Sequence, residues 1–471
     1  MSITKKISVY PDSNKTVNDW EKYYRLNNYY HNNLQRFVSH LIPEPASVLE
    51  VGSNGGELLR SLPNKKKVGV VMDNSFLRIT RKKCPKIDFF SINDLSKLHG
   101  KKFDYILVNH VLSEIKDVQS FIEKLKLFMN QDTRIVVFSF NYLWKPVLSF
   151  GEIIGLKRPQ KFEPNWLSEG DIDNLFNLDL FEKVKSGRKF LIPYNIPYIS
   201  HIVNRYFSPL PVINSFSFIQ YAIYRPIKSK KDYSVSIIIP ERNEAGHIRG
   251  ILKSLPKFRK RTEVIFVEGH SKDNTYEVIK EEIKKYKGPL TAKLFKQKGK
   301  GKGDAVRLGF SKARNELLMI LDGDLTVGPE ELPKFYRAAS YGQGDLIMGS
   351  RLVYPMEKQA MRTLNILGNK FFSLAFTFLL DQKIKDTLCG TKVLLRKDYE
   401  MIVKNRKIFG DFDPFGDYDL IFGSAKLNLK ILEIPIRYKQ RVYGTTNISR
   451  FTHGWLLLKM VYFAAKNLKF V

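Results

Sequence analysis

The sequence predicts an α/β protein made of two domains, each built around a mainly parallel sheet. Three observations support this: a length of 471 residues, which is more than one ordinary core accommodates; two series of short apolar strands that alternate with helix-like segments; and a polar stretch, PIKSKKDY, between the two series. We therefore expect a first domain at 1–225, a linker at 226–233 and a second domain at 234–471.

Each predicted strand is a short run of β-branched and other apolar residues. The first series is ASVLEV, KVGVVM, YILVNHVL and RIVVFSF, and the second is SVSIIIP, EVIFVE and ELLMILDGDL. Segments with helical character separate them, which is typical of doubly wound sheets. Such sheets collect ligands where their strands end.

The charge balance points to an anionic partner. Lys and Arg number 78 against 47 Asp and Glu, a formal net charge of +31. The basic residues lack the compact basic and aromatic clustering of a nucleic-acid module, so nucleic acid is the less favoured partner and an anionic membrane surface the more favoured one. Cys84 and Cys389 form no Cys-x-x-Cys pair, which indicates neither a disulfide framework nor a zinc site and suits the reducing cytoplasm.

Two apolar segments near the end of the chain could meet a membrane without crossing it. The N-terminus has no apolar signal-peptide core, and no run of 18 apolar residues occurs. Segments 364–380 and 455–471 mix apolar and aromatic residues with lysine, as interfacial helices do, although buried core helices have the same appearance. With the net charge, they favour peripheral attachment at the cytoplasmic face of a membrane.

Three motifs follow the first strands in order. The segment VLEVGSNGG is a strand that runs into a glycine-rich turn, where the backbone can approach a ligand closely. About twenty residues later Asp73 ends the second strand, where a carboxylate can accept both hydroxyls of a ribose. Asp94 follows, and Asn109 and His110 stand at the end of another strand.

The order of these motifs resembles class I S-adenosylmethionine-dependent methyltransferases, with their Rossmann-like sheet, over roughly residues 20–225. The resemblance implies a cofactor site in which Glu50, Gly52 and Gly56 hold the methionine part, Asp73 the ribose and Asp94 the adenine edge, with Asn109 beside them. Asn54 stands where the family usually has glycine, which leaves open a domain that binds without catalysing. His110 is a candidate base, but a single histidine after a strand is more often structural. The methyl acceptor stays open.

The strands of the second series are also followed by charged residues. SIIIPERNE and EVIFVEGHSKDNT are strands followed by acids, and LLMILDGDL places Asp322 and Asp324 two residues apart at a strand exit. Paired carboxylate oxygens suit a hard cation such as Mg²⁺ or Mn²⁺, which also binds a diphosphate.

Together with KGKGDAVRLGF, these motifs resemble the inverting family 2 glycosyltransferases with the GT-A fold, over roughly Ser234 to Phe451. The resemblance implies that Asp322 and Asp324 meet the metal, with Asp324 as its direct ligand. The implied contacts to the nucleotide-sugar donor are Pro240, Glu244, Glu268, Lys302, Asp304 and Asp322. Glu268 is followed by Gly269 where the family has two adjacent acids, so a GDP-sugar and a UDP-sugar both stay open, as does the sugar.

Four further motifs concern the acceptor. MGSRL, DTLCGTK, FGDYDL and RVYGTTNISRF resemble dolichyl-phosphate mannose synthase and other polyprenyl-phosphate glycosyltransferases. Arginine binds phosphate with paired donors, so Arg351 and Arg441 become candidate clamps for a lipid phosphate. A phosphate monoester is anionic and needs no base, whereas a saccharide hydroxyl, the alternative acceptor, would need Asp417 or Asp419 to take its proton. The expectation is a bifunctional enzyme.

Overall fold

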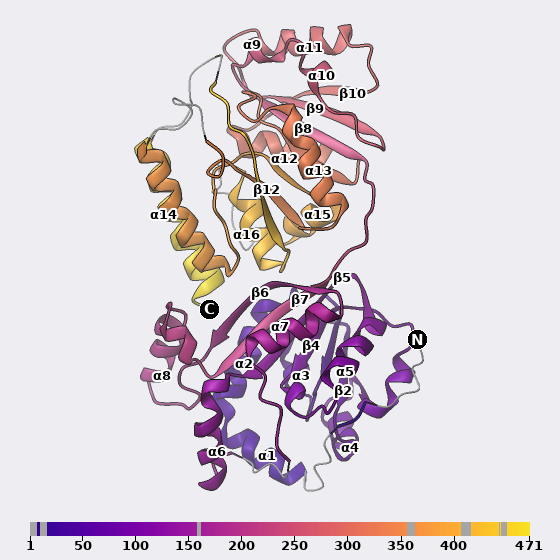
Figure 1. Ribbon diagram of the computed structural model, residues 1–471, viewed down its shortest axis with the longest axis vertical. Helices are drawn as coiled ribbons and strands as arrows, with labels where there is room; N and C mark the ends of the chain where they lie inside the picture. Colours follow the sequence, from indigo (N-terminus) through magenta and orange to yellow (C-terminus); the bar gives the residue numbers. More distant parts are fainter. Residues whose placement is uncertain are drawn as a thin grey trace. The chain divides into compact units, whose positions relative to one another are not determined.

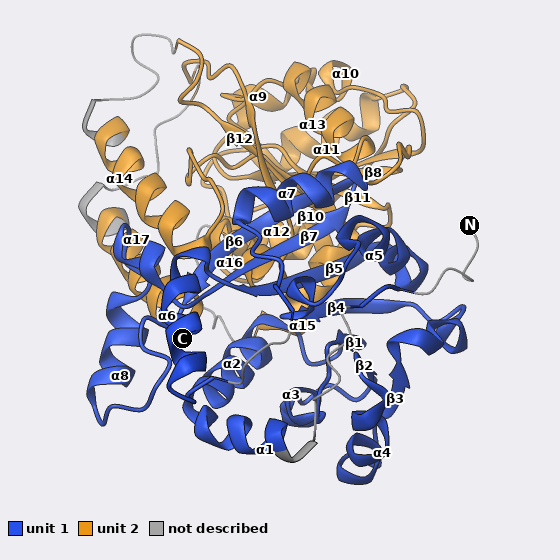
Figure 2. Ribbon diagram, turned by 60° about the horizontal axis from the view of Figure 1, so that its bottom comes forward, with its two compact units in different colours: residues 1–227, 470–471 blue, residues 228–469 orange. Residues whose placement is uncertain are grey.

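A computed structural model describes residues 7–9, 17–157, 162–355, 363–406, 416–441, 443 and 450–471. The chain divides into two compact units (Figure 2): unit 1 is Met1–Ile227 with Phe470–Val471, and unit 2 is Lys228–Lys469. The division falls inside the polar stretch 226–233.

Unit 1 contains a seven-stranded sheet in the order β3-β2-β1-β4-β5-β7-β6 (Figure 2). Its strands are β1 (Val48–Val51), β2 (Lys67–Val71), β3 (Asp88–Ser91), β4 (Phe103–Asn109), β5 (Met129–Phe140), β6 (Phe181–Lys189) and β7 (Ile219–Pro226). The first five run parallel, and β7 is antiparallel to both of its neighbours. The carboxyl ends of β1, β2 and β4 therefore meet at one edge.

Both faces of this sheet are covered. The α-helices are α1 (Val17–Leu26), α2 (Asn28–Leu41), α3 (Glu57–Ser61), α4 (Asn74–Lys83), α5 (Val118–Leu125), α6 (Lys145–Ile153), α7 (Glu169–Leu178) and α8 (Ile199–Ile202). Side chains alternate along each strand, so Leu49 packs in the cluster that includes α5 and α7, and Val48 in the cluster that includes α2 and α3. The prediction of a doubly wound first sheet is confirmed.

Unit 2 contains a second seven-stranded sheet, in the order β10-β9-β8-β11-β13-β12-β14. Its strands are β8 (Val235–Glu241), β9 (Thr262–Glu268), β10 (Thr291–Lys296), β11 (Leu317–Ile320), β12 (Leu346–Ser350), β13 (Lys392–Leu395) and β14 (Ile431–Pro435). Strands β10, β9, β8 and β11 are parallel neighbours. Strand β13 is antiparallel to β11 and β12, which makes the sheet mixed.

Helices cover both faces of the second sheet. They are α9 (Ala245–Ile248), α10 (Ile251–Ser254), α11 (Thr275–Lys285), α12 (Lys302–Lys312), α13 (Leu332–Ser340), α14 (Thr363–Leu380), α15 (Arg396–Lys404), α16 (Tyr418–Lys426) and α17 (Arg450–Ala464). Ile237 and Ile239 of β8 pack with α10, α11 and α13, whereas Ile238 faces α12, where Gly309 leaves room for it. The predicted two-domain α/β architecture is confirmed.

Helices α14 and α17 correspond to the two apolar segments noted in the sequence, and they pack against each other (Figure 1). Their inner sides are buried, with Phe376 beside Phe422 of α16 and Met460 enclosed. No helix within the described ranges is both long and apolar enough to cross a bilayer.

Candidate active sites

Glu50 lies at the centre of the candidate site in unit 1. Its carboxylate accepts hydrogen bonds from Ser53 Oγ at 2.7 Å and from Asn109 Nδ2 at 2.9 Å, which joins the ends of β1 and β4. Burial raises the pKa of Glu50 to about 7, although both hydrogen bonds oppose the rise. Gly52 and Gly56 have positive φ values of 97° and 77°, which L side chains adopt only under strain, so the turn requires glycine at both positions.

Several polar atoms in this turn are buried without a hydrogen-bond partner among the described residues. They are Asn54 Oδ1, Asn109 Oδ1 and His110 Nδ1. Buried polar atoms are nearly always paired, so such a group of unpaired atoms at a strand edge fits a polar ligand that completes them. S-adenosylmethionine carries an amino group and hydroxyls that could donate hydrogen bonds to the side-chain oxygens of Asn54 and Asn109. Asn54 would therefore supply an acceptor at the position where the family usually has glycine.

The two predicted nucleoside contacts lie farther along the same edge. Asp73 caps α4, accepting a hydrogen bond from Ser75 N at 2.8 Å with its Oδ1. Asp94 follows β3 and forms a partly exposed ion pair with Lys97 at 2.9 Å. Each carboxylate keeps an oxygen toward which a ribose or an adenine could donate. Their ligand contacts remain predictions.

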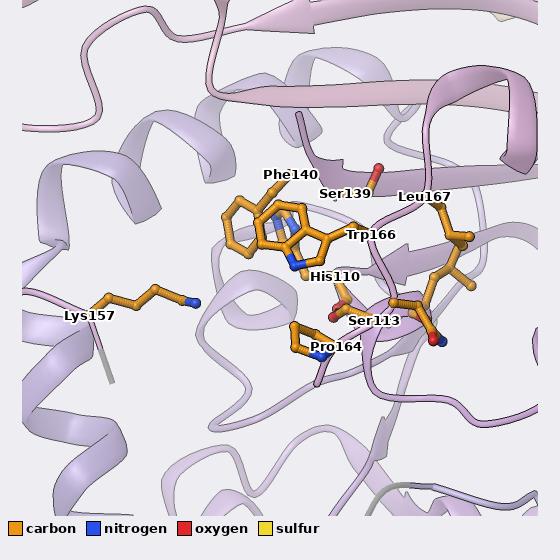
Figure 3. A pocket seen from close by; sticks show the side chains of 10 residues that line it. His110, Ser113, Ser139, Phe140, Lys157, Pro164, Trp166 and Leu167 are labelled. Atoms are coloured by element: carbon orange, nitrogen blue, oxygen red, sulfur yellow. The ribbon is translucent and has the colours of Figure 1, made fainter. Parts of the chain in front are cut away.

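His110 lines a pocket beside this site (Figure 3). The pocket is also lined by Ser113, Phe140, Lys157 and Trp166. The imidazole stacks on Phe140 at 4.4 Å, and its Nε2 lies 2.7 Å from the Tyr30 hydroxyl. Burial lowers the pKa of His110 to about 3. The ring is therefore a neutral, weak base, which agrees with a structural role.

In unit 2, acids from three neighbouring strands meet at the carboxyl edge. Glu241 ends β8 and pairs in register with Glu268, which ends β9, while Asp322 and Asp324 follow β11. Pro240, in the same register, lies opposite Val267. Glu268 accepts a hydrogen bond from Ser271 N at 2.5 Å and keeps its second oxygen buried and unpaired among the described residues. The parallel pairing of β9, β8 and β11 thus assembles the predicted donor edge.

The sequence comparison with known motifs overlooked Glu241. Its side chain is only 1% exposed, and both carboxylate oxygens are without a partner in the described part of the chain. Burial raises its pKa well above the usual value, and the nearby Glu244, Asp324 and Asp322 raise it further. The carboxyl packs on Gly323, where an added Cβ would force it to shift. Glu241 thus lies next to the segment that carries both predicted metal ligands.

A chain of alternating charges crosses the centre of the site. Lys302 Nζ lies 2.6 Å from Asp322 Oδ1, and Lys392 Nζ lies 2.7 Å from Asp417 Oδ1. Although burial lowers the pKa of Lys302, Asp322 and Asp417 raise it more, so this lysine is a permanent cation. A fixed cation beside the aspartate pair suits the diphosphate of a donor.

Two other predicted residues have local partners. Asp304, in the first turn of α12, accepts a hydrogen bond from Gly299 N at 3.0 Å and so fixes the KGKG turn. Asp419 forms ion pairs with Arg307 at 3.5 Å and Arg406 at 3.2 Å. Phe415, the first residue of FGDYDL, lies outside the described residues.

The two predicted phosphate clamps differ. Arg351 is buried and donates to both oxygens of Asp386, at 2.7 and 2.8 Å, while Asn369 donates to the same carboxylate at 2.9 Å. Despite burial, Arg351 lowers the pKa of Asp386 to about 2. This bidentate pair was not foreseen, and it means that Arg351 could meet a phosphate only by sharing its guanidinium with Asp386.

Arg441 lies among the donor-site acids. It contacts Glu244 and forms an ion pair with Asp324 at 3.5 Å. Next to it, Tyr443 packs on Gly246 and on the ring of His247. Of the motif RVYGTTNISRF, Val442 and residues 444–449 lie outside the described residues. Arg441 thus balances charge at the acids that the sequence assigned to the donor and the metal.

The residues at the carboxyl edge of the second sheet meet some of the needs of a divalent cation. The donors are hard carboxylate oxygens, which suit Mg²⁺ or Mn²⁺. Within the described ranges, no group of three or more His, Cys, Asp or Glu side chains is arranged to hold a metal ion. Asp322 and Asp324 would therefore hold the cation together with oxygens from the donor diphosphate, as Mg²⁺ often binds.

Comparisons with known proteins match both halves of the chain. Residues 22–180 match the model of a methyltransferase domain, and residues 236–402 match that of glycosyl transferase family 2. The glycosyltransferase AglJ of Haloferax volcanii is 27% identical over 50% of this chain and 72% of its own. A dolichol-phosphate mannosyltransferase of Pyrococcus furiosus is 32% identical over 45% of this chain and 59% of its own length, so the chain spans less than two thirds of that relative.

A solved structure of a SAM-dependent methyltransferase from Thermotoga maritima covers 45% of this chain and 96% of its own, with 14% identity and a TM-score of 0.35. By these family matches, the chain contains a methyltransferase domain followed by a family 2 glycosyltransferase domain.

Proposed function

We propose that unit 2 transfers a sugar from a GDP- or UDP-sugar to a polyprenyl phosphate of the dolichyl type, with inversion, and that unit 1 transfers a methyl group from S-adenosylmethionine. The observation that carries the first activity is the meeting of Glu241, Glu268, Asp322 and Asp324 beside Lys302. A cation on the two aspartates would stabilise the charge that develops on the leaving diphosphate. The relatives whose names include dolichol phosphate support the acceptor.

The ion pairs of the other two aspartates favour a phosphate acceptor. Asp417 is held by Lys392 and Asp419 by Arg307 and Arg406. To take a proton from a hydroxyl, either carboxylate would have to leave its ion pair. A phosphate monoester needs no proton removed, so it can attack the anomeric carbon while both aspartates keep their partners.

Arg441 is the more suitable of the two candidate phosphate clamps. A cation that binds Asp324 would compete with its guanidinium there, and the released donors could then meet the acceptor phosphate. Arg441→Gln should raise the KM for polyprenyl phosphate while kcat changes less. A larger effect on donor binding than on acceptor KM would assign Arg441 to the donor instead.

Helices α14 and α17 support contact with the membrane that carries such an acceptor. Leu367, Phe371 and Leu374 repeat at helical spacing on α14, and all three are exposed. On α17 Trp455, Leu458 and Tyr462 do the same. Apolar and aromatic stripes of this kind, on a chain with a net charge of +31, suit an interfacial position at the cytoplasmic face.

A donor screen tests the glycosyltransferase proposal. Purified protein is incubated with Mn²⁺, a short polyprenyl phosphate and radiolabelled GDP- or UDP-sugars, and the product is partitioned between organic solvent and water. We expect label in the organic phase with one donor. Label confined to the aqueous phase would favour the alternative acceptor, a saccharide hydroxyl.

Calorimetry with S-adenosylmethionine tests the methyltransferase proposal. The unpaired Asn54 and Asn109 oxygens favour binding, and Asp73→Ala serves as the control that weakens it. We expect the wild type to show heat of binding and Asp73→Ala to lose it. Absent binding in the wild type would favour the alternative, a module that docks or regulates the transferase.

A further inference from the structure

Unit 1 exposes a broad apolar surface that neither candidate site uses. It consists of segment 142–156, which includes α6, and segment 194–216, which includes α8; we call it the apolar face. In and next to α6, Leu143, Val147, Phe150 and Ile154 repeat at helical spacing and are all exposed. The most exposed members of the face are Ile153, Tyr198 and Val212, at 81%, 87% and 77%. Soluble proteins rarely expose so many large apolar side chains together without an interaction partner.

The two segments form one continuous surface. Asn141 Nδ2 donates to the carbonyls of Ser215 and Ser217, both at 2.8 Å. Trp144 Nε1 donates to the carbonyl of Phe216 at 2.8 Å, and its ring meets Phe218 at 5.0 Å. Figures 1 and 2 show α6 and α8 on the same side of unit 1. The apolar residues of both segments are therefore held together by the fold.

The composition of the apolar face favours a lipid bilayer as its partner. Its exposed rings include Tyr142, Phe150, Tyr194, Tyr198, Tyr206, Phe207 and Phe216. Aromatic residues of this kind gather at the boundary between lipid and water. Glu152 is the one acid in the two segments, and it is paired with Lys157. The basic side chains Lys145 and Arg205 suit anionic headgroups, to which acids would be unfavourable.

The apolar face leads directly to the pocket beside the cofactor site. Phe140 and Lys157, which line the pocket, flank segment 142–156 in the sequence (Figure 3). At the rim of the pocket, the ring of Tyr142, which belongs to the apolar face, contacts the ring of Trp166, which lines the pocket. The contact is T-shaped, with ring centroids 6.4 Å apart. His110, which stacks on Phe140, adjoins Asn109, whose side chain contacts Glu50. An apolar surface thus continues into a pocket that ends at the methyl-donor residues.

We propose that the apolar face docks unit 1 on an anionic lipid bilayer, and that the methyl acceptor is an amphiphile of that bilayer whose polar head enters the pocket lined by His110, Phe140 and Trp166. The identity of the acceptor rests on the proposed methyltransferase function. The docking itself rests only on the apolar face.

Reporter cysteines placed on the apolar face test the docking in the full chain. Both native cysteines, Cys84 and Cys389, are buried, so an exposed third cysteine can be labelled selectively with a fluorophore that responds to polarity. Ile153→Cys and Tyr198→Cys place the label on the face. Leu178→Cys, at a residue of α7 that is 74% exposed and lies outside the face, is the matched control. Vesicles of phosphatidylglycerol and phosphatidylcholine are then added.

We expect a blue shift and a rise in emission at positions 153 and 198 and no change at 178. If the protein sediments with vesicles while labels at 153 and 198 do not respond, another surface binds the membrane and the proposal is wrong. A response that needs no vesicles and grows with protein concentration would show that the face binds protein, which also overturns it.

A charged variant separates docking from cofactor binding. Phe150→Glu combined with Ile153→Glu should abolish the vesicle response of a label at 198, while S-adenosylmethionine binding measured by calorimetry stays unchanged. Neither side chain lines the pocket. An undiminished response at 198 would contradict the docking. Absent cofactor binding in the wild type would instead contradict the methyltransferase proposal and leave the docking result to stand.

Discussion

Asp324 is the residue whose loss should affect the sugar site most. Its Oδ1 accepts hydrogen bonds from Thr326 N and Thr326 Oγ1, which aim the carboxylate. Asp324→Ala should abolish sugar transfer, because the cation would lose its direct ligand and the leaving diphosphate its neutralising charge. Radiolabel transfer measures activity, and circular dichroism checks that the fold is intact. Turnover that still depends on metal in this variant would place the cation elsewhere.

We expect the ionised Glu50 carboxylate to lower the free energy of unfolding while it contributes to cofactor binding. Its pKa is raised by burial from 4.5 to about 7, so the folded protein binds this proton more tightly than the unfolded chain does. The free energy of unfolding therefore falls as pH rises between these values and stays lower above them. At pH 8 Glu50→Gln should be more stable than the wild type, by an amount on the order of 3 kcal/mol.

Urea unfolding at pH 5 and pH 8 measures this difference, which should be large only at the higher pH. Calorimetry should show that the same variant binds S-adenosylmethionine much more weakly, because it has lost the carboxylate at the turn. A variant no more stable than the wild type at pH 8 would mean that Glu50 is ionised at little cost in the folded protein.

At this scale, motif order predicted which acids stand at the strand ends, because strand exits are readable from an apolar run followed by charge. The partners of those side chains were not readable. Arg351 and Asp386 are 35 residues apart, and only the pairing of β12 with β13, together with the segment before β13, brings them together. The burial of Glu241 depends on Gly323, which follows a different strand.

At the scale of elements, α14 should contribute a measurable part of membrane binding. Leu374→Glu places a charge on its exposed stripe without touching the buried Phe376. The variant should bind anionic vesicles several-fold more weakly, because a carboxylate in the interface opposes both burial and the headgroup charge. Sedimentation with vesicles measures it, and Met401→Glu, on α15, is a matched exposed control. Equal loss in both variants would mean that general charge, and not α14, governs binding.

Truncation after residue 453 tests α17 in the same assay. The deletion removes the exposed Trp455 and Tyr462 together with the buried Met460. Weaker sedimentation with an unchanged melting temperature would assign the helix to the membrane. Unchanged sedimentation with a lowered melting temperature would assign it to the core of unit 2.

The apolar segments show what a sequence pattern can and cannot decide about elements. Their apolar content predicted that both are helices, and α14 and α17 are helices. It could not decide between burial and exposure, because both helices are apolar around most of their circumference. The structure shows one buried side and one exposed stripe on each. Strands β6 and β10, by contrast, lack a continuous apolar run that would have defined their bounds.

For the whole molecule, two cores in two units imply two separable sites. S-adenosylmethionine at about one hundred times its Kd should stabilise unit 1 by about 2.7 kcal/mol, because it binds the folded unit alone. Differential scanning calorimetry should show one transition moving and another staying in place. Asp324→Ala should leave this shift unchanged. A single transition that moves as a whole would show that the units unfold cooperatively.

The contact between Glu241 and Gly323 has a consequence for how such sequences can change. A side chain at 323 has no space while the carboxyl at 241 lies against it. Gly323→Ala should therefore shift the Glu241 carboxyl and lower sugar transfer, and adding Glu241→Ala should not restore the transfer, because it removes one of the acids of the site.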